Sequence, residues 1–430
     1  MIYLILIAGF LLRLVNLNQS LWLDESIEVL AVKNHSYLDL ITKYALGDFH
    51  PPLYHLILKF WDGIFGYSET ASRFPSIIFG VITCYFVYLI GKKLFSQKAG
   101  ILAGLFMALN PLAIYYSQEA RMYSLAMMAV TAAVYFLLSK KWIWFTFFLA
   151  LSLYTDYLPY LMLPVYWLIT DKKKALLCCY IVSLVTLIPW LPYFWQQLHI
   201  GTSAAAKTPL WGQVVGGLSL KTVPLTFIKF IIGRISSPDK IIYGAVSLVL
   251  ALFYLYLIYK GRKRDLLLWL LIPAVLGVII SLKIPVFSYF RFLFIVPAFI
   301  LLIAGGAQKK TVLAIPVVLI SLVSLAIFTF YPGFQREDWR SAVSYMESSG
   351  TLVLMPSLAQ VSPLDYYRHN LTVMDKNNVK LSGQPTVFLA RYVQELFDPQ
   401  DSLQKLLLSS GYKKTGEKSF NGVLIWKYQL

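Results

Sequence analysis

Acidic, basic and imidazole side chains occur in a few short gaps between long apolar runs. Glu119 and Arg121 stand two residues apart in "SQEAR", between two runs long enough to cross a membrane. Asp24 and Glu25 are adjacent in "SLWLDESIEV", and His50 precedes two prolines in "GDFHPPLYHL". A charge beside hydrocarbon is costly and usually marks a functional site. A carboxylate can act as a general base, and a guanidinium group binds phosphate through a fork of donors.

The elements that must position these residues are apolar helices. The 430 residues are 58% hydrophobic and only 14% charged, with a mean hydropathy of +0.65. Apolar runs of about the length that a bilayer requires recur along the chain, which predicts an all-α polytopic membrane protein. We expect about eleven transmembrane helices, near 1–17, 74–91, 99–116, 122–138, 142–155, 157–170, 175–195, 241–259, 266–282, 286–306 and 311–331.

The connectors between these spans alternate in charge. The even-numbered ones, such as "GKKLFSQK" and "YKGRKRD", carry two to four lysines or arginines each, whereas the short odd-numbered ones carry at most two. The positive-inside rule places the even set in the cytoplasm. We therefore expect a cell-membrane protein with a cytoplasmic N-terminus and an extracytoplasmic C-terminal domain. The formal charge of +17 is then a topology signal, and no nucleic-acid partner is predicted.

The first span is expected to be retained, with Arg13 reaching toward the surface from its far end. The three cysteines lie in apolar runs and suggest neither a disulfide framework nor a metal site. An apolar segment at 222–234 is too short to span and carries Lys229, so we expect an interfacial or re-entrant helix on the outer side. It lies in a long outer loop at 196–240.

The first outer loop, 18–73, is predicted to contain amphipathic helices. Apolar residues recur near helical spacing over 27–46, and Pro51 and Pro52 suit the first turn of a second helix. Purely structural roles remain open for these residues. Asp24 and Glu25 could stabilise the N-terminus of a helix through its dipole. His50 could be a structural hydrogen-bond donor. Glu119 and Arg121 could be a structural ion pair, although residues i and i+2 do not face each other on a helix.

The tail forms a separate predicted domain. Strand-like "TLVLMP", "TVFLA" and "GVLIWKYQL" flank a helix-like "DSLQKLLLSSG", which indicates a small α/β domain over 335–430 that follows a transmembrane domain over 1–334. This tail shows neither metal-ligand spacing nor a nucleophile pair. We expect it to recognise an acceptor or to stabilise the fold.

Six motifs occur in an order that resembles a known class. They are "LWLDES", "HPPLYHLIL", "SETASRFPS", "NPLAIYYSQEARMYSL", "YFRFLFIVPAFILLIAG" and "REDWRSAVSYM". Together they resemble the GT-C class of membrane glycosyltransferases, in particular bacterial and archaeal relatives of protein O-mannosyltransferases and of lipid A aminoarabinose transferases. The resemblance covers roughly residues 1–345. It implies transfer of a sugar from a polyprenyl-phosphate donor to a lipid, glycan or protein acceptor on the outer face.

The resemblance also implies site residues. The acidic residue that opens the first outer loop matches Asp24, with Glu25 beside it, as the expected catalytic base or metal ligand. His50 would line the donor cavity, and Arg121 would contact the donor phosphate. Glu119 would position Arg121 or bind a cation, so a divalent metal ion is an open prediction.

Three further residues match the motifs of the donor site. Tyr123 follows the "SQEAR" gap, and Tyr289 and Arg291 belong to the "YFR" that precedes a late span. The resemblance places them near the phosphate or the sugar. The chain lacks the large extra luminal domain of eukaryotic O-mannosyltransferases, which leaves the acceptor open.

Two rival functions follow from the same features. A flippase or transporter of lipid-linked sugars would carry internal repeats with broken helices and charges near the midplane of the membrane. No repeat is evident, and the charges gather at one edge. An O-antigen ligase or polymerase would use a diphosphate donor and a different loop layout.

Overall fold

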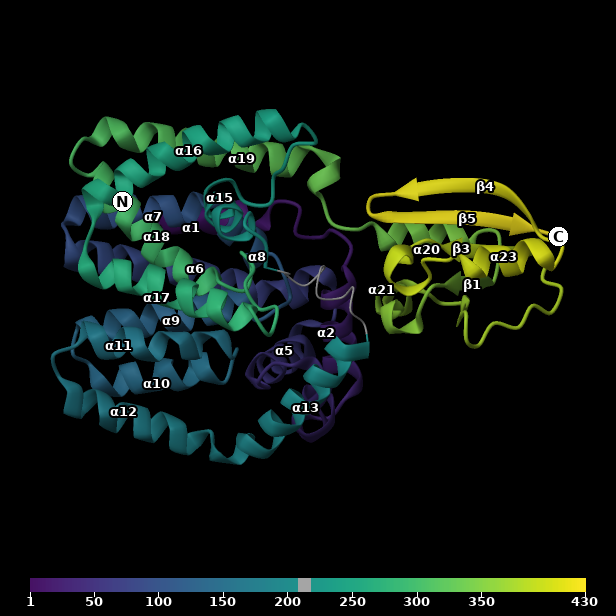
Figure 1. The fold of residues 1–430 in the computed structure, drawn as a ribbon, viewed down its shortest axis with the longest axis horizontal. Coiled ribbons are helices and arrows are strands. Elements are labelled where there is room, and N and C mark those ends of the chain that lie inside the picture. Colours follow the sequence, from purple (N-terminus) through teal and green to yellow (C-terminus); the bar gives the residue numbers. More distant parts are fainter. Residues whose placement is uncertain (208–217) are drawn as a thin grey trace. The chain divides into compact units, whose positions relative to one another are not determined.

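The computed structural model describes residues 1–207 and 218–430 as two compact units, each of which is considered by itself. The first, here the helical unit, comprises residues 1–17, 35–66 and 70–330. The second, here the tail unit, comprises residues 18–34, 67–69 and 331–430. The chain is mostly helical, and its only described sheet lies in the tail unit (Figure 1). The residues 208–217 of the predicted loop 196–240 fall outside the described residues.

The helical unit is built of apolar helices. Its long helices are α1 (Ile2–Leu14), α5 (Leu53–Phe65), α6 (Glu69–Leu94, from Thr70 onward), α7 (Gln97–Leu109), α9 (Tyr123–Leu138), α10 (Trp142–Leu153), α12 (Lys173–Thr186), α13 (Leu191–Lys207), α15 (Thr222–Ile232), α16 (Lys240–Gly261), α17 (Arg264–Ser281), α18 (Val296–Ala307) and α19 (Ala314–Phe330). The short ones include α3 (Tyr37–Asp39), α4 (Ala45–Asp48), α8 (Pro111–Ser117) and α11 (Leu163–Ile169).

Four described helical segments are long and apolar enough to cross a membrane, and up to six if each bent pair is one span. The bent pairs are α7 with α8, at 57°, and α12 with the start of α13, at 40°. Other predicted spans coincide with shorter apolar helices such as α9 and α10. The membrane-protein architecture is thus confirmed, while the number of eleven spans stays a prediction.

The break between α7 and α8 occurs at Asn110. Its side chain caps α8 by accepting a hydrogen bond from the Ala113 amide, and it donates to the Phe230 carbonyl of α15 at 2.8 Å. Pro111 at the start of α8 cannot donate to the preceding turn, so the helix cannot continue straight. The break aims α8 toward the loop that carries Glu119 and Arg121.

The prediction that Arg13 reaches the surface is wrong. Its side chain is fully buried, and it donates to the carbonyl oxygens of Gly9 at 2.8 Å and Ala108 at 3.2 Å. It also donates to the Ser117 hydroxyl at 3.1 Å. The sulfur of Cys84 lies 3.9 Å from the guanidinium group. A guanidinium group inside the bundle can satisfy the carbonyl that a broken helix leaves free, which outweighs the pull of the interface.

The first outer loop differs in detail from the prediction of one amphipathic helix over 27–46. A helix α2 (Leu23–Asn34) begins earlier and belongs to the tail unit, whereas α3, a π-turn (Leu40–Tyr44) and α4 belong to the helical unit. Ser36 interrupts the helix because its side chain accepts a hydrogen bond from the Asp39 amide and caps α3. Pro52 stands at the N-terminus of α5, as the two prolines predicted.

The tail unit contains a mixed five-stranded sheet of order β2-β1-β3-β5-β4. Strands β1 (Leu352–Met355), β2 (Thr372–Asp375) and β3 (Thr386–Ala390) are parallel, and the hairpin of β4 (Lys413–Phe420) and β5 (Val423–Gln429) continues the sheet antiparallel. Helices α20 (Trp339–Glu347), α21 (Ser362–Tyr367), α22 (Gln394–Phe397) and α23 (Ser402–Ser409) complete the unit (Figure 1).

Both faces of this sheet are covered. Val353 and Phe388 pack on one side with Trp339 of α20, while Leu354 and Leu403 pack on the other. Strands that are buried on both faces are apolar without alternation, which explains why "TLVLMP" and "TVFLA" were recognisable. The exposed strand β4 and the short strand β2 lack that signal.

Candidate active site

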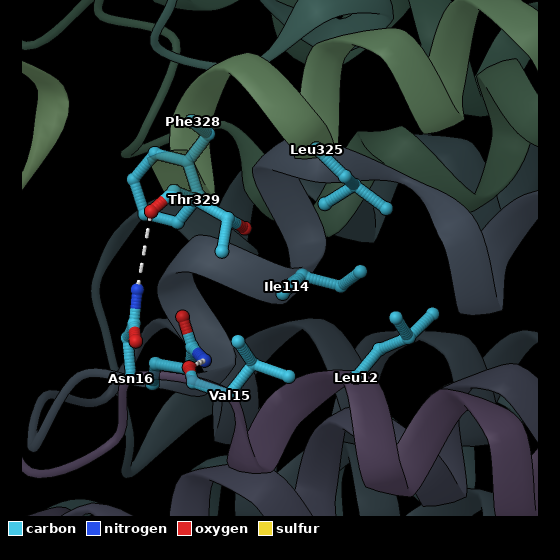
Figure 2. A pocket seen from close by; sticks show the side chains of 8 residues that line it. Leu12, Val15, Asn16, Ile114, Leu325, Phe328 and Thr329 are labelled. Atoms are coloured by element: carbon cyan, nitrogen blue, oxygen red, sulfur yellow. Dashed lines mark hydrogen bonds between the residues drawn. The ribbon is translucent and has the colours of Figure 1, made fainter. Parts of the chain in front are cut away.

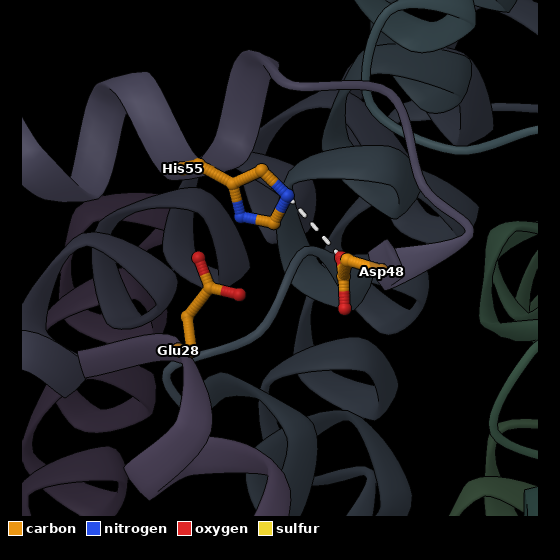
Figure 3. Close-up of side chains that lie close together, drawn as sticks. All are labelled: Glu28, Asp48 and His55. Atoms are coloured by element: carbon orange, nitrogen blue, oxygen red, sulfur yellow. Dashed lines mark ion pairs between the residues drawn. The ribbon is translucent and has the colours of Figure 1, made fainter. Parts of the chain in front are cut away.

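Asp48 is the centre of a buried ionic cluster in the helical unit. One carboxylate oxygen lies 3.2 Å from Nδ1 of His50 and 3.2 Å from Nε2 of His55, the latter drawn in Figure 3. The other lies 3.7 Å from a terminal nitrogen of Arg121. Phe49 adopts a left-handed conformation, with φ of 57°, and turns the chain so that His50 folds back on Asp48. We call these four charged or imidazole residues the Asp48 cluster.

The surroundings of Asp48 keep it ionised. Burial alone would raise the pKa of Asp48, but His50, Arg121 and the hydrogen bonds from both histidines hold that pKa well below its ordinary value. Nδ1 of His50 also lies 2.7 Å from the backbone carbonyl oxygen of Asp48. Because a carbonyl oxygen only accepts, Nδ1 carries a proton, and the imidazole is held in one orientation.

Hydrogen bonds to neighbouring helices fix the Asp48 cluster. Gln197 of α13 donates to the carbonyl oxygens of Ala45 and of His50, the latter at 3.0 Å. Ser76 of α6 donates to the carbonyl oxygen of Arg121 at 3.3 Å. Residues from four separate parts of the sequence therefore meet at one point, and the cluster is rigidly supported.

A second group of charged and phenolic residues surrounds Arg234, which follows α15. Its guanidinium group stacks over the ring of Tyr115 at 4.5 Å and donates to the Tyr115 hydroxyl. Its electrostatic neighbours also include Tyr116, Tyr289 and Glu119. We call these five residues the Arg234 cluster. Arg121 thus pairs with Asp48, while Glu119 acts electrostatically on Arg234.

Aromatic rings extend the Arg234 cluster. Tyr123, the first residue of α9, packs edge-on against Tyr116 at 5.3 Å and Phe290 at 5.7 Å. Phe290 in turn stacks on Tyr116. Arg291 behaves differently, because it donates to the Pro285 carbonyl of its own loop at 2.8 Å and lies over Phe290. Its position next to a phosphate site stays a prediction.

The predicted acidic pair lies in the first turn of α2, in the tail unit. Glu25 is fully buried, and its carboxylate lies 3.4 Å from the guanidinium group of Arg336. Asp24 is partly exposed. Burial, followed by the carboxylates of Glu337 and Asp24, raises the pKa of the Tyr392 hydroxyl. The two adjacent acids therefore have different environments.

Sequence reasoning did not single out Asp48, His55 or Arg234. Asp48 and His55 stand in the same "GDFHPPLYHL" segment as His50, where alternating acid and imidazole residues were a usable signal. Arg234 ends an apolar segment, and only the assignment of that segment to the outer side could have pointed to it. The predicted residues His50 and Arg121 do meet at Asp48, and Glu119 and Tyr289 are electrostatic neighbours of Arg234.

A small cavity lies elsewhere in the helical unit, between α1, α8 and α19 (Figure 2). Its volume is about 30 Å³, and Asn16 bridges its mouth by donating to the Thr329 carbonyl at 3.3 Å. Binding sites for small molecules usually measure roughly several hundred Å³. This cavity therefore has room for water but not for a sugar.

Residues 49–193 match the family of dolichyl-phosphate-mannose-protein mannosyltransferases. A search of curated protein sequences found no significant match. The fold is similar to that of ArnT from Cupriavidus metallidurans bound to undecaprenyl phosphate, with a TM-score of 0.59, 12% identity, and coverage of 99% of this chain and 96% of that one. The chain has the GT-C fold. The prediction of a GT-C-class membrane glycosyltransferase is confirmed by the family match together with this fold.

A second GT-C structure is more distant in architecture. It is an archaeal oligosaccharyltransferase, AglB from Archaeoglobus fulgidus, in complex with an inhibitory peptide and a dolichol-phosphate. The TM-score is 0.52 at 12% identity, with 99% of this chain and 74% of that chain covered. Another structure of the Archaeoglobus enzyme contains Zn and sulfate. The family match begins one residue after Asp48 and includes His50, Glu119, Arg121 and Tyr123.

Proposed function

We propose that the protein transfers a sugar from a polyprenyl-phosphate donor to an acceptor hydroxyl group at the outer face of the membrane. The observation that carries this proposal is a pair of buried guanidinium groups linked to the loop 118–122: Arg121 belongs to this loop, and Arg234 is under the electrostatic influence of its Glu119. Its support also includes the family match, which names a dolichyl-phosphate-mannose donor, and the structural relative bound to undecaprenyl phosphate.

The donor phosphate would bind between Arg121 and Arg234. Guanidinium groups bind phosphate oxygens through paired N–H donors and stabilise negative charge on a leaving group. His50 would supply a further donor or ligand beside Arg121. Tyr123 and Tyr289 would line the sugar side with their rings, and Arg291 would approach from its own loop.

Asp24 is the proposed general base, with Glu25 beside it. The carboxylate takes the proton of the acceptor hydroxyl group, and the acceptor oxygen forms a bond to C1 of the sugar. The bond between C1 and the phosphate oxygen breaks, and its electron pair leaves with the polyprenyl phosphate. Attack from the opposite face inverts the configuration at C1.

The donor atoms of the Asp48 cluster suit a divalent metal ion. A carboxylate oxygen close to two imidazole nitrogens is a set that Zn²⁺ and related ions bind, once the proton on Nδ1 of His50 is released to solvent. Asp48, His50 and His55 would hold such an ion, and the ion would supply positive charge for phosphate oxygens. The Zn in a structure of the Archaeoglobus relative motivates the test of metal dependence. Asp24, Glu25 and Glu119 are the alternative ligands that the sequence predicted.

An apolar groove of about 530 Å³ suits the polyprenyl chain of the donor. It is lined by Leu218, Ser219, Leu220, Val223 and Val278. Val223 lies near the first turn of α15, and Arg234 follows the last turn of the same helix. Eleven residues at 1.5 Å rise give a separation on the order of 16 Å, which several isoprene units would bridge.

The proposed orientation has the N-terminus in the cytoplasm and the residues 335–430 outside. The alternation of lysine-rich and lysine-poor connectors supports it. The tail would then meet an acceptor lipid, glycan or protein outside the cell. Labelling of single cysteines placed at Lys172 and Lys418 with an impermeant maleimide tests this: only the second should react in intact cells.

A transport function is the rival proposal. A flippase needs a path for the headgroup through the membrane, with charges near the midplane. Arg13 lies inside an apolar helix, and its contacts are with helix carbonyls, a hydroxyl group and a thiol. Lys229 lies in the short apolar helix α15, where it donates to the carbonyl oxygens of Arg234 and Ile235. The chemistry-bearing residues instead form the Asp48 and Arg234 clusters, which favours an enzyme.

The decisive experiment is a transfer assay with purified protein in lipid nanodiscs. Radiolabelled polyprenyl-phosphate mannose, glucose, galactose and aminoarabinose would be supplied with a cell-envelope extract as acceptor. Wild type should consume one of the donors, and the variants Asp24→Asn, Arg121→Met and Arg234→Met should lose at least about 100-fold in rate. Consumption of none of the four donors would refute the proposed reaction.

A matched control separates phosphate binding from general damage. Arg262 stacks over Tyr259 at 4.2 Å, much as Arg234 stacks over Tyr115 at 4.5 Å. Arg262 lies in a different connector, outside both clusters. Arg262→Met should therefore keep wild-type activity, and equal losses in Arg262→Met and Arg234→Met would argue against a phosphate role.

A further inference from the structure

The tail motif "REDWR", residues 336–340, binds the start of the first loop within the tail unit. The backbone amide of Arg336 donates to the Gln19 side chain at 2.9 Å, and the amide of Arg340 donates to the Ser20 hydroxyl at 3.2 Å. The Arg340 guanidinium group donates to the Asn18 carbonyl at 2.9 Å. Segments more than 300 residues apart are thus joined in register just before α2.

The same motif continues onto α2 itself. Arg336 forms the buried ion pair with Glu25, and its own side chain is only 5% exposed. Glu337 accepts hydrogen bonds from the Tyr392 hydroxyl at 3.0 Å and the Trp339 indole at 2.9 Å, which holds the motif on the sheet. Leu23 of α2 packs into the same hydrophobic core as Trp339. The helix that carries Asp24 is therefore an integral part of the tail unit.

We propose that Glu25 and Arg336 form a positioning pair that fixes α2, so that Asp24 alone is the base. This inference rests on the proposed function and deepens it. A general base must reach the proton of its substrate, and partly exposed Asp24 can do so. Glu25 is fully buried and engaged by Arg336, which suits a structural anchor. The tail would thus contribute to catalysis by holding the base.

The physical basis is the asymmetry of a buried ion pair. Removing one partner leaves an uncompensated buried charge, whereas replacing both with apolar residues of similar size is often tolerated. Loss of Arg336 should therefore displace Glu25 and the first turn of α2. A displacement of about 1 Å at a catalytic group can reduce the rate on the order of 100-fold.

The test combines activity with hydrogen–deuterium exchange on the full chain in nanodiscs. Arg336→Met and Glu25→Gln should each lower kcat on the order of 100-fold with KM for the consumed donor little changed. Each should also accelerate amide exchange in α2. The double variant Glu25→Leu/Arg336→Met should recover activity to within about 10-fold of wild type, because no buried charge is left unpaired.

The double variant separates the two roles of Glu25. If Glu25 were itself the base, every variant without its carboxylate would stay inactive, and the inference would be overturned. The inference would also be overturned if Arg336→Met left amide exchange in α2 unchanged. It would be overturned as well if Arg336→Met accelerated that exchange but kept full activity. If wild type consumed no donor, the proposed function would fail, while the exchange data would still decide whether the pair holds α2.

The control is a half-buried arginine pair of the tail unit. Arg391 binds both carboxylate oxygens of Asp401 at 2.7 Å, away from α2. Arg391→Met should destabilise the sheet region and leave the exchange of α2 unchanged. Equal effects of Arg391→Met and Arg336→Met on α2 and on kcat would show a general stability effect and refute a specific positioning role.

Discussion

Replacement of Arg13 tests the packing of the helical unit where the sequence interpretation failed. The substitution Arg13→Lys distinguishes an arginine that extends to the membrane surface from an arginine that is buried in the helical unit. Lysine also reaches the interface, so the first interpretation predicts no change. The structure instead has donors aimed at the carbonyl of Ala108, at the end of α7, and at the Ser117 hydroxyl at the end of α8. A single ammonium group cannot reproduce that fork.

The magnitude follows from these bonds. Hydrogen bonds to a charged group contribute about 1.5–3 kcal/mol each, so the bonds to Ala108 and Ser117 together amount to about 3–6 kcal/mol. Removal of a buried cation recovers part of its desolvation cost. We expect a net loss of about 1–4 kcal/mol for Arg13→Met, and a loss of similar size for Arg13→Lys.

The assay is thermal unfolding in nanodiscs together with amide exchange of the loop 118–122. Gln118 donates from its side chain to the Val15 carbonyl at 2.6 Å and the Arg13 carbonyl at 3.1 Å, so disturbance at α1 should reach this loop. Exposed Arg264, at the start of α17, provides the control Arg264→Met, which should be neutral. An unfolding midpoint and loop exchange equal to wild type for both Arg13 variants would refute the reasoning.

Three further predictions follow from other parts of the molecule. Gly261→Ala should lower the unfolding midpoint because the new methyl group would clash with the Leu302 carbonyl, whereas Gly244→Ala on the same helix meets nothing within 4 Å and should be neutral or slightly stabilising. Asp398 accepts from two amides at the start of α23, which lowers its pKa despite its burial. Asp398→Asn should therefore speed exchange of α23 at pH 7 by an amount matching about 0.5–2 kcal/mol, and the difference from wild type should vanish as pH falls below about 3.8 through the lowered pKa. Chelator treatment followed by Zn²⁺ should raise the unfolding midpoint of wild type and leave His55→Ala unchanged; equal responses would place any metal elsewhere.

Local patterns predicted much of the fold. The length of the apolar runs identified membrane helices, and the doubly buried strands of the tail were visible as unbroken apolar segments. The clustering of Glu119 and Arg121 between helices marked a loop in which the structure buries both charged side chains, while its functional role stays a prediction. Each of these signals depends only on neighbouring residues, which is why one sequence sufficed.

Contacts between residues far apart in the sequence could not be predicted. Nothing near Glu25 indicates that its partner is Arg336, because 311 positions separate them. An arginine near the end of an apolar helix can either extend to the membrane surface or bind free carbonyl oxygens inside the bundle. The sequence does not show the helix break at Asn110, so it could not decide between these two positions for Arg13. Arg234 was missed because a single cation after an apolar helix has no local pattern.

The charge balance of the two clusters bears on how the proposed donor would bind. Arg121 faces Asp48 and Arg234 faces Glu119, so these four groups sum to zero before any donor arrives. The paired carboxylates hold the guanidinium groups in place and avoid uncompensated charge. A sugar–phosphate–lipid diester brings one negative charge, and breaking the sugar bond adds a second on the departing phosphate. That added charge requires a further cation, and a metal ion held by the residues of the Asp48 cluster would supply one. We therefore propose that the Asp48 cluster would stabilise the leaving group, most strongly as the bond breaks.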